Sequence, residues 1–284
     1  MAPCTTNEHG PGLGQDGPSL RPGEFRLFQD LMYREAGIAL SERKTALVEG
    51  RLRRRLLNLH LDSFRAYHEH ISRPENGRER QQCLDALTTN ETFFFRHKQH
   101  WDFLLQEILP GWIQEHPEST VFRAWSAACS TGEEPYSLAI ALDEGLGRKR
   151  RRWQVHASDL NSSVLARASQ AFYGDYALQK ITPLCLKRYF LQVGDSHQVR
   201  SELRSRVQFR THNLMQESHG DTYDVIFLRN VLIYFDEASK QTVIGHIDRR
   251  LRPGGHLFLG ASESLSNTRG YRMLRPTIYR KGAA

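Results

Sequence analysis

The stretch WSAACSTGEEPYSLAI, residues 125–140, reads as the end of an apolar strand, a tight turn of small residues and the start of a helix. A strand, a turn and a helix form the repeating unit of a doubly wound α/β sheet, in which ligands bind outside the carboxyl ends of the strands. Small side chains at Ala127, Ala128 and Gly132 let a ligand approach the backbone closely. The stretch therefore predicts a doubly wound, Rossmann-like domain with its ligand site at this turn.

The charge of this turn restricts the kind of ligand. Glu133 and Glu134 open the helix, and the GxGxxG pattern of dinucleotide sites is absent. Two carboxylates at a helix N-terminus repel a pyrophosphate but attract a cation. S-adenosylmethionine carries a sulfonium, an ammonium group and no phosphate, so it fits such a turn. The alternative is that both glutamates only complement the helix dipole.

A further acidic residue follows the next expected strand, in WQVHASDLN (153–161). Asp159 stands at the end of that strand, where an acidic side chain accepts hydrogen bonds from both ribose hydroxyls. The alternative role is to cap a helix that begins at Asn161, and both roles can coexist.

Composition places the chain among soluble proteins of ordinary size. Its 284 residues suffice for one full domain and a smaller one, and no apolar run approaches the roughly 20 residues that cross a bilayer. We recognise no secretory signal, and the four cysteines lack CxxC spacing, so we expect reduced thiols, a cytoplasmic location and no membrane insertion. The formal net charge of +7 favours an acidic partner or an anionic ligand.

The first part of the chain predicts a tail and a helical domain. Residues 1–23 are rich in proline and glycine, which predicts a disordered tail. Residues 24–88 predict about four helices, the first ending in a left-handed cap at Gly37 and the second starting with Ser41 as its N-cap. The apolar face of the second helix is expected to contain Leu47, Leu52, Leu56 and Leu57.

Beyond the helical domain, short apolar strands alternate with helical segments, as in a parallel doubly wound sheet. The expected strands are VFRAWS (121–126), WQVHAS (153–158), YDVIFL (223–228) and HLFLG (256–260). Between the second and third of them, residues 176–210 predict an inserted hairpin element with Gly194 and Asp195 in its turn. YRMLRPTIYRK (271–281) contains a proline and predicts an edge strand or an antiparallel hairpin.

The expected strand at 223–228 leads directly into Arg229 and Asn230, and Tyr234 follows about one helical turn later. This is the position in the sheet where the reacting group should lie. No Ser/His/Asp set and no cluster of metal-ligating residues is evident in the sequence, so we expect no metal.

Five motifs, taken in order, resemble the chemotaxis receptor glutamate methyltransferases of the CheR type, which are class I S-adenosylmethionine-dependent methyltransferases. The motifs are LTTNETFFFR (87–96), WSAACSTGEEPYSLAI (125–140), ASDLN (157–161), HNL (212–214) and FLRNVLIYFD (227–236). They span most of residues 24–284. The resemblance implies a helical N-terminal domain (24–88) and a methyltransferase domain (89–284) with an inserted antiparallel β subdomain near 176–210.

The resemblance also implies a reaction and a site. The methyl group of S-adenosyl-L-methionine passes to a receptor glutamate for chemosensory adaptation, leaving S-adenosyl-L-homocysteine. Arg96 is expected to steer the incoming carboxylate, and Tyr234 to lie near the transferred methyl. Asp159 is expected to bind ribose, and Glu134, or its neighbour Glu133, the methionine ammonium. The remaining cofactor contacts implied are Asn90, Thr92, Arg96, Asn213, Leu214, Arg229 and Asn230.

The implied partner is the glutamate-rich coiled coil of chemoreceptors, and the basic helix 41–57 is expected to dock it. The cations of this helix are Arg43, Lys44, Arg51, Arg53, Arg54 and Arg55. A solvated helix face is the alternative. GRKRRRW (147–153) predicts a solvated loop far from the site. The short turn at Gly194 favours a form that is independent of a receptor C-terminal pentapeptide tether, and we expect a monomer.

Two rival functions compete with this interpretation. A nucleic-acid-binding protein would place its basic runs on phosphates, but aromatic residues are not interleaved with these runs and an NPPY motif is absent. We therefore expect no nucleic-acid partner. The second rival is a regulator that binds the cofactor without catalysis.

Overall fold

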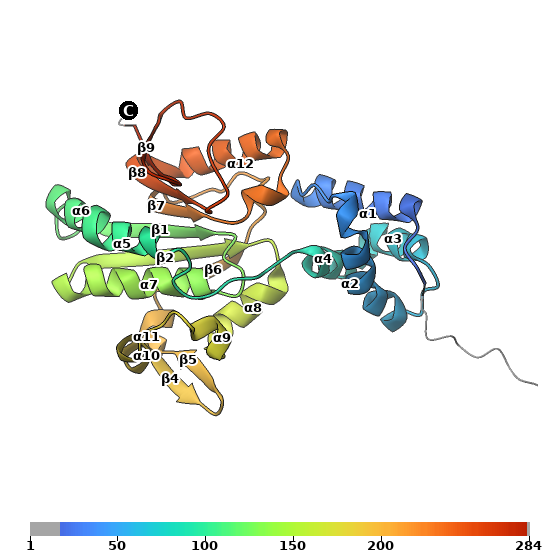
Figure 1. Ribbon diagram of the computed structural model, residues 1–284, viewed down its shortest axis with the longest axis horizontal. Coiled ribbons are helices and arrows are strands. Elements are labelled where there is room, and N and C mark those ends of the chain that lie inside the picture. Colours follow the sequence, from blue (N-terminus) through green and yellow to red (C-terminus); the bar gives the residue numbers. More distant parts are fainter. Residues whose placement is uncertain (1–17, 283–284) are drawn as a thin grey trace, which may run out of the picture. The chain divides into compact units, whose positions relative to one another are not determined.

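The computed structural model of the chain describes residues 18–282, and the chain divides into two compact units (Figure 1). One unit contains Ser41–Leu87 and the residues up to Leu31, and the other contains Met32–Leu40 and Thr88–Ala284. Most of the expected tail lies outside the described residues, but its last two residues already belong to a helix. None of the helices in the described part is long and apolar enough to span a membrane.

The first unit is helical. Its elements are α1 (Pro22–Ala36), of which the part from Met32 onward belongs to the second unit, and η1 (Glu42–Lys44), α2 (Thr45–Asn58), α3 (Phe64–Ser72), η2 (Pro74–Asn76) and α4 (Gly77–Leu87). In its core the Phe28 ring packs against the rings of Phe64 and Tyr67. At the end of α1, Gly37 has a φ of 69° and its N–H donates to the Tyr33 carbonyl, which confirms the predicted left-handed cap.

Two predictions about α2 are wrong. The Ser41 side chain makes no cap hydrogen bond, and a 3-10 turn precedes the helix, which begins at Thr45. The buried residues of α2 are Val48, Leu52 and Leu56. A spacing of four keeps these three on one stripe, whereas one further residue turns Leu57 about 100° away. Leu57 is accordingly 55% exposed.

The second unit is built on a seven-stranded sheet with the order β6-β2-β1-β7-β8-β10-β9 (Figure 1). Its strands are β1 (Val121–Ala127), β2 (Arg152–Asp159), β6 (Val207–Thr211), β7 (Tyr223–Leu228), β8 (Leu251–Leu259), β9 (Tyr271–Arg275) and β10 (Ile278–Lys281). The first five in this order pair in parallel, and β10 pairs antiparallel with β8 and β9. The four predicted strands and the terminal hairpin are confirmed, and with them the doubly wound sheet.

Helices cover both faces of this sheet (Figure 1). The helical segments around it are α5 (Lys98–Phe103), η3 (Leu104–Ile108), α6 (Leu109–Glu115), α7 (Glu133–Gly145), η4 (Gly147–Lys149), α8 (Ser162–Gln170), η5 (Leu232–Tyr234) and α12 (Glu237–Arg250). One core contains Phe227 of β7 and Leu138 of α7, and the other contains Leu228 and Ile247 of α12. Alternate β7 residues thus enter opposite cores, which explains the unbroken apolar run in this strand.

A three-stranded antiparallel sheet with the order β3-β5-β4 follows α8. The elements of this insertion are β3 (Phe172–Tyr173), α9 (Asp175–Leu178), α10 (Pro183–Tyr189), β4 (Phe190–Val193), β5 (Ser196–Val199) and α11 (Ser201–Arg204). Val193 pairs with Ser196, so Gly194 and Asp195 form the predicted turn. Residues 207–210, which we expected in the insertion, belong instead to β6, because their backbone pairs in parallel with β2.

Candidate functional site

The turn after β1 is tightly packed. Ala128, Ser130 and Gly132 have left-handed backbone conformations, with φ of 67°, 50° and 98°. A Cβ atom on Gly132 would lie 2.7 Å from the Tyr173 Oη and 2.9 Å from the Ala168 Cβ. Both backbone conformation and space therefore require glycine at this position, and α7 begins directly after it.

Asp159 ties the end of β2 to this turn. Its two carboxylate oxygens accept hydrogen bonds from the backbone N–H of Ser130, at 2.8 Å, and of Asn161, at 2.9 Å. The alternative that Asp159 caps α8 is wrong, because Asn161 is the N-cap and its side chain accepts from the Val164 N–H. Asp159 therefore remains a buried carboxylate at the carboxyl end of a central strand.

Glu134 and Arg229 form an ion pair beside the turn, with both side chains almost fully buried. The Arg229 Nε lies 2.7 Å from Glu134 Oε2, and the Ser126 hydroxyl donates to Glu134 Oε1 at 2.6 Å. Burial raises the pKa of Glu134 and lowers that of Arg229, while attraction within the pair opposes both shifts. The charge of Glu134 is thus balanced inside the protein.

Glu133 has a different environment. It is buried and accepts a hydrogen bond from the Thr131 hydroxyl at 2.7 Å. Burial raises the pKa of its carboxyl. Within residues 18–282, the salt bridges that form at separations of up to 4.0 Å include Glu134 but not Glu133. The negative charge of Glu133 therefore lacks the close compensation that Arg229 gives its neighbour.

The segment between α4 and α5 is bonded to the ends of β1 and β2. The Asn90 carbonyl accepts from the Ser130 hydroxyl at 2.8 Å. The Asn161 side chain donates to the Thr88 hydroxyl oxygen, also at 2.8 Å. Thr92, in the same segment, is half-buried. The part of the segment around Thr88 and Asn90 therefore lies along the same sheet edge as the acidic turn.

Arg229 anchors the end of this segment as well. Its Nη1 donates to the Arg96 carbonyl at 2.8 Å and to the His100 Nδ1 at 3.1 Å. Because Nδ1 accepts, the neutral imidazole of His100 carries its proton on Nε2 and donates to the Thr277 hydroxyl oxygen at 2.9 Å. Burial and the Arg229 charge lower the pKa of His100 to about 3. Sequence reasoning missed His100, since nothing marks it within an ordinary helical segment.

Asn213 and Leu214 follow β6. The Asn213 Nδ2 donates to the Glu35 carbonyl at 2.6 Å, and its Oδ1 accepts from the Met215 N–H at 3.0 Å. Leu214 is buried in the core that contains α12. Asn213 therefore holds the loop after β6 through backbone groups on both sides.

A buried carboxylate, Glu263, joins the loops after β7 and β8. Its Oε2 accepts from the N–H groups of Asn230, at 2.8 Å, and Gly260, at 2.6 Å. Its Oε1 accepts from the Ile233 N–H at 3.3 Å. Asn230 has a left-handed φ of 58°, and a Cβ on Gly260 would lie 2.7 Å from the Asn230 nitrogen. Glu263 thus holds the backbone that carries Asn230 and Tyr234.

Sequence reasoning missed Glu263 too, although a signal was available. The residue lies in GASES (260–264), directly after an expected strand, where a carboxylate falls at the ligand edge. Tyr234 was predicted, and the structure places it half-buried at the end of η5, with its carbonyl accepting from the Ala39 N–H at 2.9 Å.

Glu133, Glu134 and Asp159 place three carboxylates at the carboxyl ends of the parallel strands, and we call this side of the sheet the acidic edge. Together with the strand order, the acidic edge defines a Rossmann-like methyltransferase. Residues 90–279 match the CheR methyltransferase SAM binding domain, and residues 23–88 match the CheR methyltransferase all-alpha domain. The chain therefore belongs to the CheR methyltransferase family.

Individual relatives agree with this assignment. The chain is 38% identical to the chemotaxis protein methyltransferase of Salmonella typhimurium, over 92% of this chain and 91% of that protein. It is 41% identical to chemotaxis protein methyltransferase 2 of Pseudomonas aeruginosa, over 85% of this chain and 86% of that protein. Among solved structures, the glycopeptide N-methyltransferase MtfA is 15% identical, with a TM-score of 0.35 over 66% of this chain and 60% of that chain.

The enzyme is thus a methyltransferase that uses S-adenosylmethionine as its cofactor. The side chains of the acidic edge fit this cofactor. Carboxylates at Glu133 and Asp159 suit an ammonium and ribose hydroxyls, whereas the one buried guanidinium beside them, that of Arg229, is already paired. Because S-adenosylmethionine carries no phosphate, its site needs no phosphate-binding element.

Proposed function

We infer that this enzyme transfers the methyl group of S-adenosylmethionine to glutamate side chains of chemoreceptors, giving glutamate 5-O-methyl esters and S-adenosylhomocysteine for chemosensory adaptation. The observation that carries the proposal is that both CheR methyltransferase domains match this chain in order. The acidic edge supports it, because that edge suits a cationic cofactor without phosphate. The proposal places the enzyme in the cytoplasm, where the signalling parts of its substrates lie.

We assign cofactor binding to the residues gathered at the sheet edge. Asp159 binds the ribose hydroxyls, since a carboxylate has about four acceptor positions. Glu133 and Glu134 face the methionine ammonium as a pair, and the environment of Glu133 makes it the better electrostatic partner. The remaining contacts come from Asn90, Thr92, Arg96, Asn213, Leu214, Arg229 and Asn230.

Bound S-adenosylmethionine supplies an electrophilic methyl group. A glutamate with a pKa of about 4.3 is ionised at neutral pH, so the protein needs no general base to activate it. The residues of the edge instead remove water from the substrate carboxylate and hold its oxygen in line at roughly 3 Å. Tyr234 lies next to the reacting groups, and Arg96 guides the carboxylate towards them.

A single assay tests the reaction. The full chain is incubated with methyl-labelled S-adenosylmethionine and chemoreceptor-rich membranes, or with DNA, and the products are treated with base. Label on the membrane protein that base releases as methanol is the expected result, because a glutamate ester is base-labile. Label on DNA alone, or cofactor binding without any transfer, would instead support the nucleic-acid or regulatory alternative.

Arg96→Ala is expected to lower kcat/KM for the receptor by about tenfold to a hundredfold, the usual worth of a hydrogen bond to a charged group. The affinity for S-adenosylmethionine should fall by a smaller factor, because Arg96 is only one of several residues assigned to the cofactor. The Arg96 guanidinium lies over the Phe93 ring and donates to the Glu91 carbonyl at 3.2 Å, whereas its own backbone carbonyl holds Arg229. The substitution therefore removes the guanidinium but keeps the backbone carbonyl that accepts a hydrogen bond from Arg229.

Lys98→Ala is the matched control for Arg96→Ala. It removes the same charge from an exposed position two residues further on, where Lys98 pairs with Asp102. We expect unchanged kinetics from this variant. Intact receptor methylation by Arg96→Ala, with normal cofactor binding, would show that the steering role is wrong.

Docking of the acidic receptor by helix 41–57 is part of the proposal. Contacts within the helical unit already occupy several of the cations of this helix. Arg55 contacts Glu79 and Gln82, Arg53 pairs with Glu49, and both bonds lie within the helical unit. Arg51 donates to a backbone carbonyl of α4. The exposed cations are Arg43 and Arg54. These two are the strongest candidates for a receptor contact.

The double variant Arg43→Glu/Arg54→Glu is expected to raise KM for the receptor by about tenfold, with a weaker effect at high salt, because surface charges steer association. Arg148→Glu/Lys149→Glu, at two exposed positions within η4, serves as the control. Equal losses from both double variants would contradict specific docking by α2.

We further propose that the enzyme acts as a monomer without a receptor pentapeptide tether. The β4–β5 turn of the insertion contains only Gly194 and Asp195, which supports this form. Calorimetry with the C-terminal peptide of a receptor is the check, and measurable binding to the isolated enzyme would contradict the proposal.

A further inference from the structure

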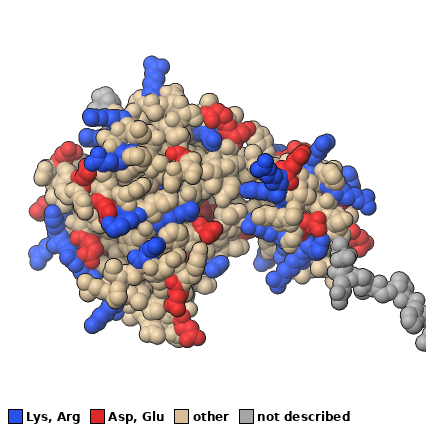
Figure 2. Space-filling model, viewed as in Figure 1, with Lys and Arg blue, Asp and Glu red and all other residues tan. Residues whose placement is uncertain are grey.

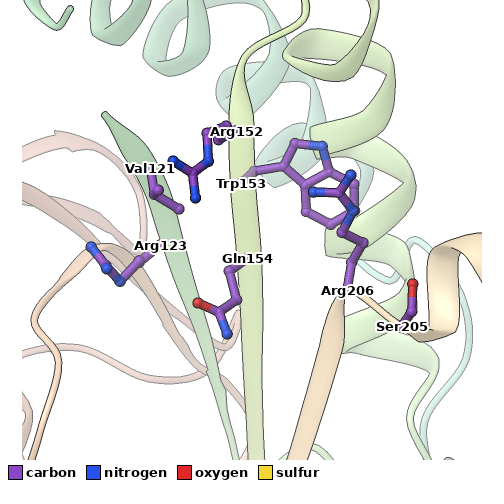
Figure 3. Close-up of a pocket in the computed structure, with 7 residues that line it drawn as sticks. All are labelled: Val121, Arg123, Arg152, Trp153, Gln154, Ser205 and Arg206. Atoms are coloured by element: carbon purple, nitrogen blue, oxygen red, sulfur yellow. The ribbon is translucent and has the colours of Figure 1, made fainter. Parts of the chain in front are cut away.

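A pocket of about 290 Å³ lies at the amino-terminal ends of β1, β2 and β6 (Figure 3). The candidate methyl-transfer site lies at the carboxyl ends of the same parallel strands. With a rise of about 3.3 Å per residue, the length of β1 separates the two places by about 20 Å. This pocket is therefore distinct from the site at the acidic edge.

Three arginines from three neighbouring parts of the sheet line this pocket. Arg123 comes from β1, Arg152 from the start of β2, and Arg206 from the residue that precedes β6 (Figure 3). Gln154 and Ser205 add an amide and a hydroxyl that can donate hydrogen bonds. None of the described residues that line the pocket carries a carboxylate, so the pocket gathers positive charge and hydrogen-bond donors.

The protein holds these guanidinium groups without neutralising them fully. Arg206 lies over the Trp153 ring, 5.5 Å from its centroid, a contact that orients the cation but leaves its charge. Within residues 18–282 the buried Arg123 Nε finds no hydrogen-bond partner and only a loose ion pair, with the Asp221 carboxylate 3.6 Å away. Among the described residues, the ion pairs include neither Arg152 nor Arg206, both of which are exposed. The three arginines thus place positive charge around this pocket, and a bound anion would balance it.

The basic run 147–153 contributes to this pocket rather than forming a uniformly solvated loop. Arg151 turns inward and donates to the Ile113 carbonyl at 3.1 Å, and Arg148 pairs with Glu144 at 2.7 Å. Arg152 instead lines the pocket. Figure 2 shows basic side chains gathered on this edge of the sheet unit, at the left of the view, where α7 ends in Figure 1.

We propose that this pocket binds a small molecule with two linked phosphate groups. One guanidinium group can donate two parallel hydrogen bonds to the oxygens of a phosphate or a carboxylate. Three guanidinium groups therefore offer more hydrogen-bond donors than a single carboxylate can accept. The pocket volume of about 290 Å³ leaves room for more than one phosphate. The site is independent of the proposed methyl transfer, since none of its residues lies at the acidic edge.

Calorimetric titration of the full chain with inorganic pyrophosphate tests the proposal. We expect saturable binding of one pyrophosphate and about tenfold weaker binding by Arg152→Ala/Arg206→Ala, which removes two of the three guanidinium groups. Orthophosphate and acetate should bind more weakly than pyrophosphate. Both replaced side chains are exposed, so the variant should fold, and unchanged affinity for S-adenosylmethionine verifies that it does.

The control is Arg148→Ala/Lys149→Ala, which removes two charges from the same basic run but outside the pocket. It should change pyrophosphate binding by about twofold or less, as screened surface charges do. Equal weakening by both double variants would reduce the proposal to general electrostatic attraction and overturn it. Absence of pyrophosphate binding, or binding of a polyglutamate peptide or a DNA oligonucleotide in its place, would also overturn it.

Discussion

Glu134→Ala is expected to lower the free energy of unfolding of the methyltransferase unit by about 3–5 kcal/mol, the cost of leaving a buried charge without its partner. The substitution strands the Arg229 guanidinium, which is buried and bonded to Glu134 at 2.7 Å. It also removes the acceptor of the Ser126 hydroxyl. Urea denaturation followed by circular dichroism measures the loss, as a shift of the midpoint at unchanged slope.

Two further variants separate charge from packing at this pair. Glu134→Gln keeps an oxygen for the Ser126 hydroxyl or for Arg229, and should be destabilised less than Glu134→Ala. Glu134→Leu/Arg229→Met removes both charges and should recover most of the stability, because paired apolar replacements often do. This double variant should nevertheless lack methyltransferase activity, since Arg229 also holds the Arg96 carbonyl and His100. If Glu134→Ala lowered the free energy of unfolding by less than about 1 kcal/mol, the Arg229 charge would not depend on Glu134, because water or other groups of the cofactor site would already balance it.

Glu263→Ala is expected to lower kcat by about a hundredfold, because displacements of about 1 Å in positioning elements have effects of that size. The variant releases the N–H groups of Asn230, Gly260 and Ile233 from one carboxylate. Amide hydrogen exchange should therefore accelerate at these three residues while the amides within β7 and β8 stay protected. Stopped-time methylation assays and exchange measured by NMR give the two readouts.

Glu263→Gln provides the rescue for this experiment. Its amide oxygen can still accept from both Asn230 and Gly260, so most of the activity and of the exchange protection should return. Glu217→Ala removes an exposed carboxylate that contacts Arg249 and should change neither readout. Unchanged kcat in Glu263→Ala, together with unchanged protection at the three amides, would show that Glu263 does not position this loop.

The elements of the fold followed from local patterns in the sequence. The unbroken run in β7 is buried on both faces, as the pattern of a central parallel strand predicts. The Gly194–Asp195 turn and the left-handed end of α1 were predicted correctly because turn chemistry depends on a few adjacent residues. Errors arose where neighbours in the sequence compete for one role, as Asn161 and Asp159 do for the cap of α8.

By itself, the sequence determined the strands, the small-residue turn and the acidic character of its helix start, since these are properties of consecutive residues. Only the tertiary structure decided how those acids are used. Glu134 and Arg229 are 95 positions apart, and they meet because β1 and β7 pair side by side and end at the same edge. Glu263 reaches Asn230 for the same reason across β7 and β8. Sheet pairing converts separate strand ends into one site, and no local pattern contains that information.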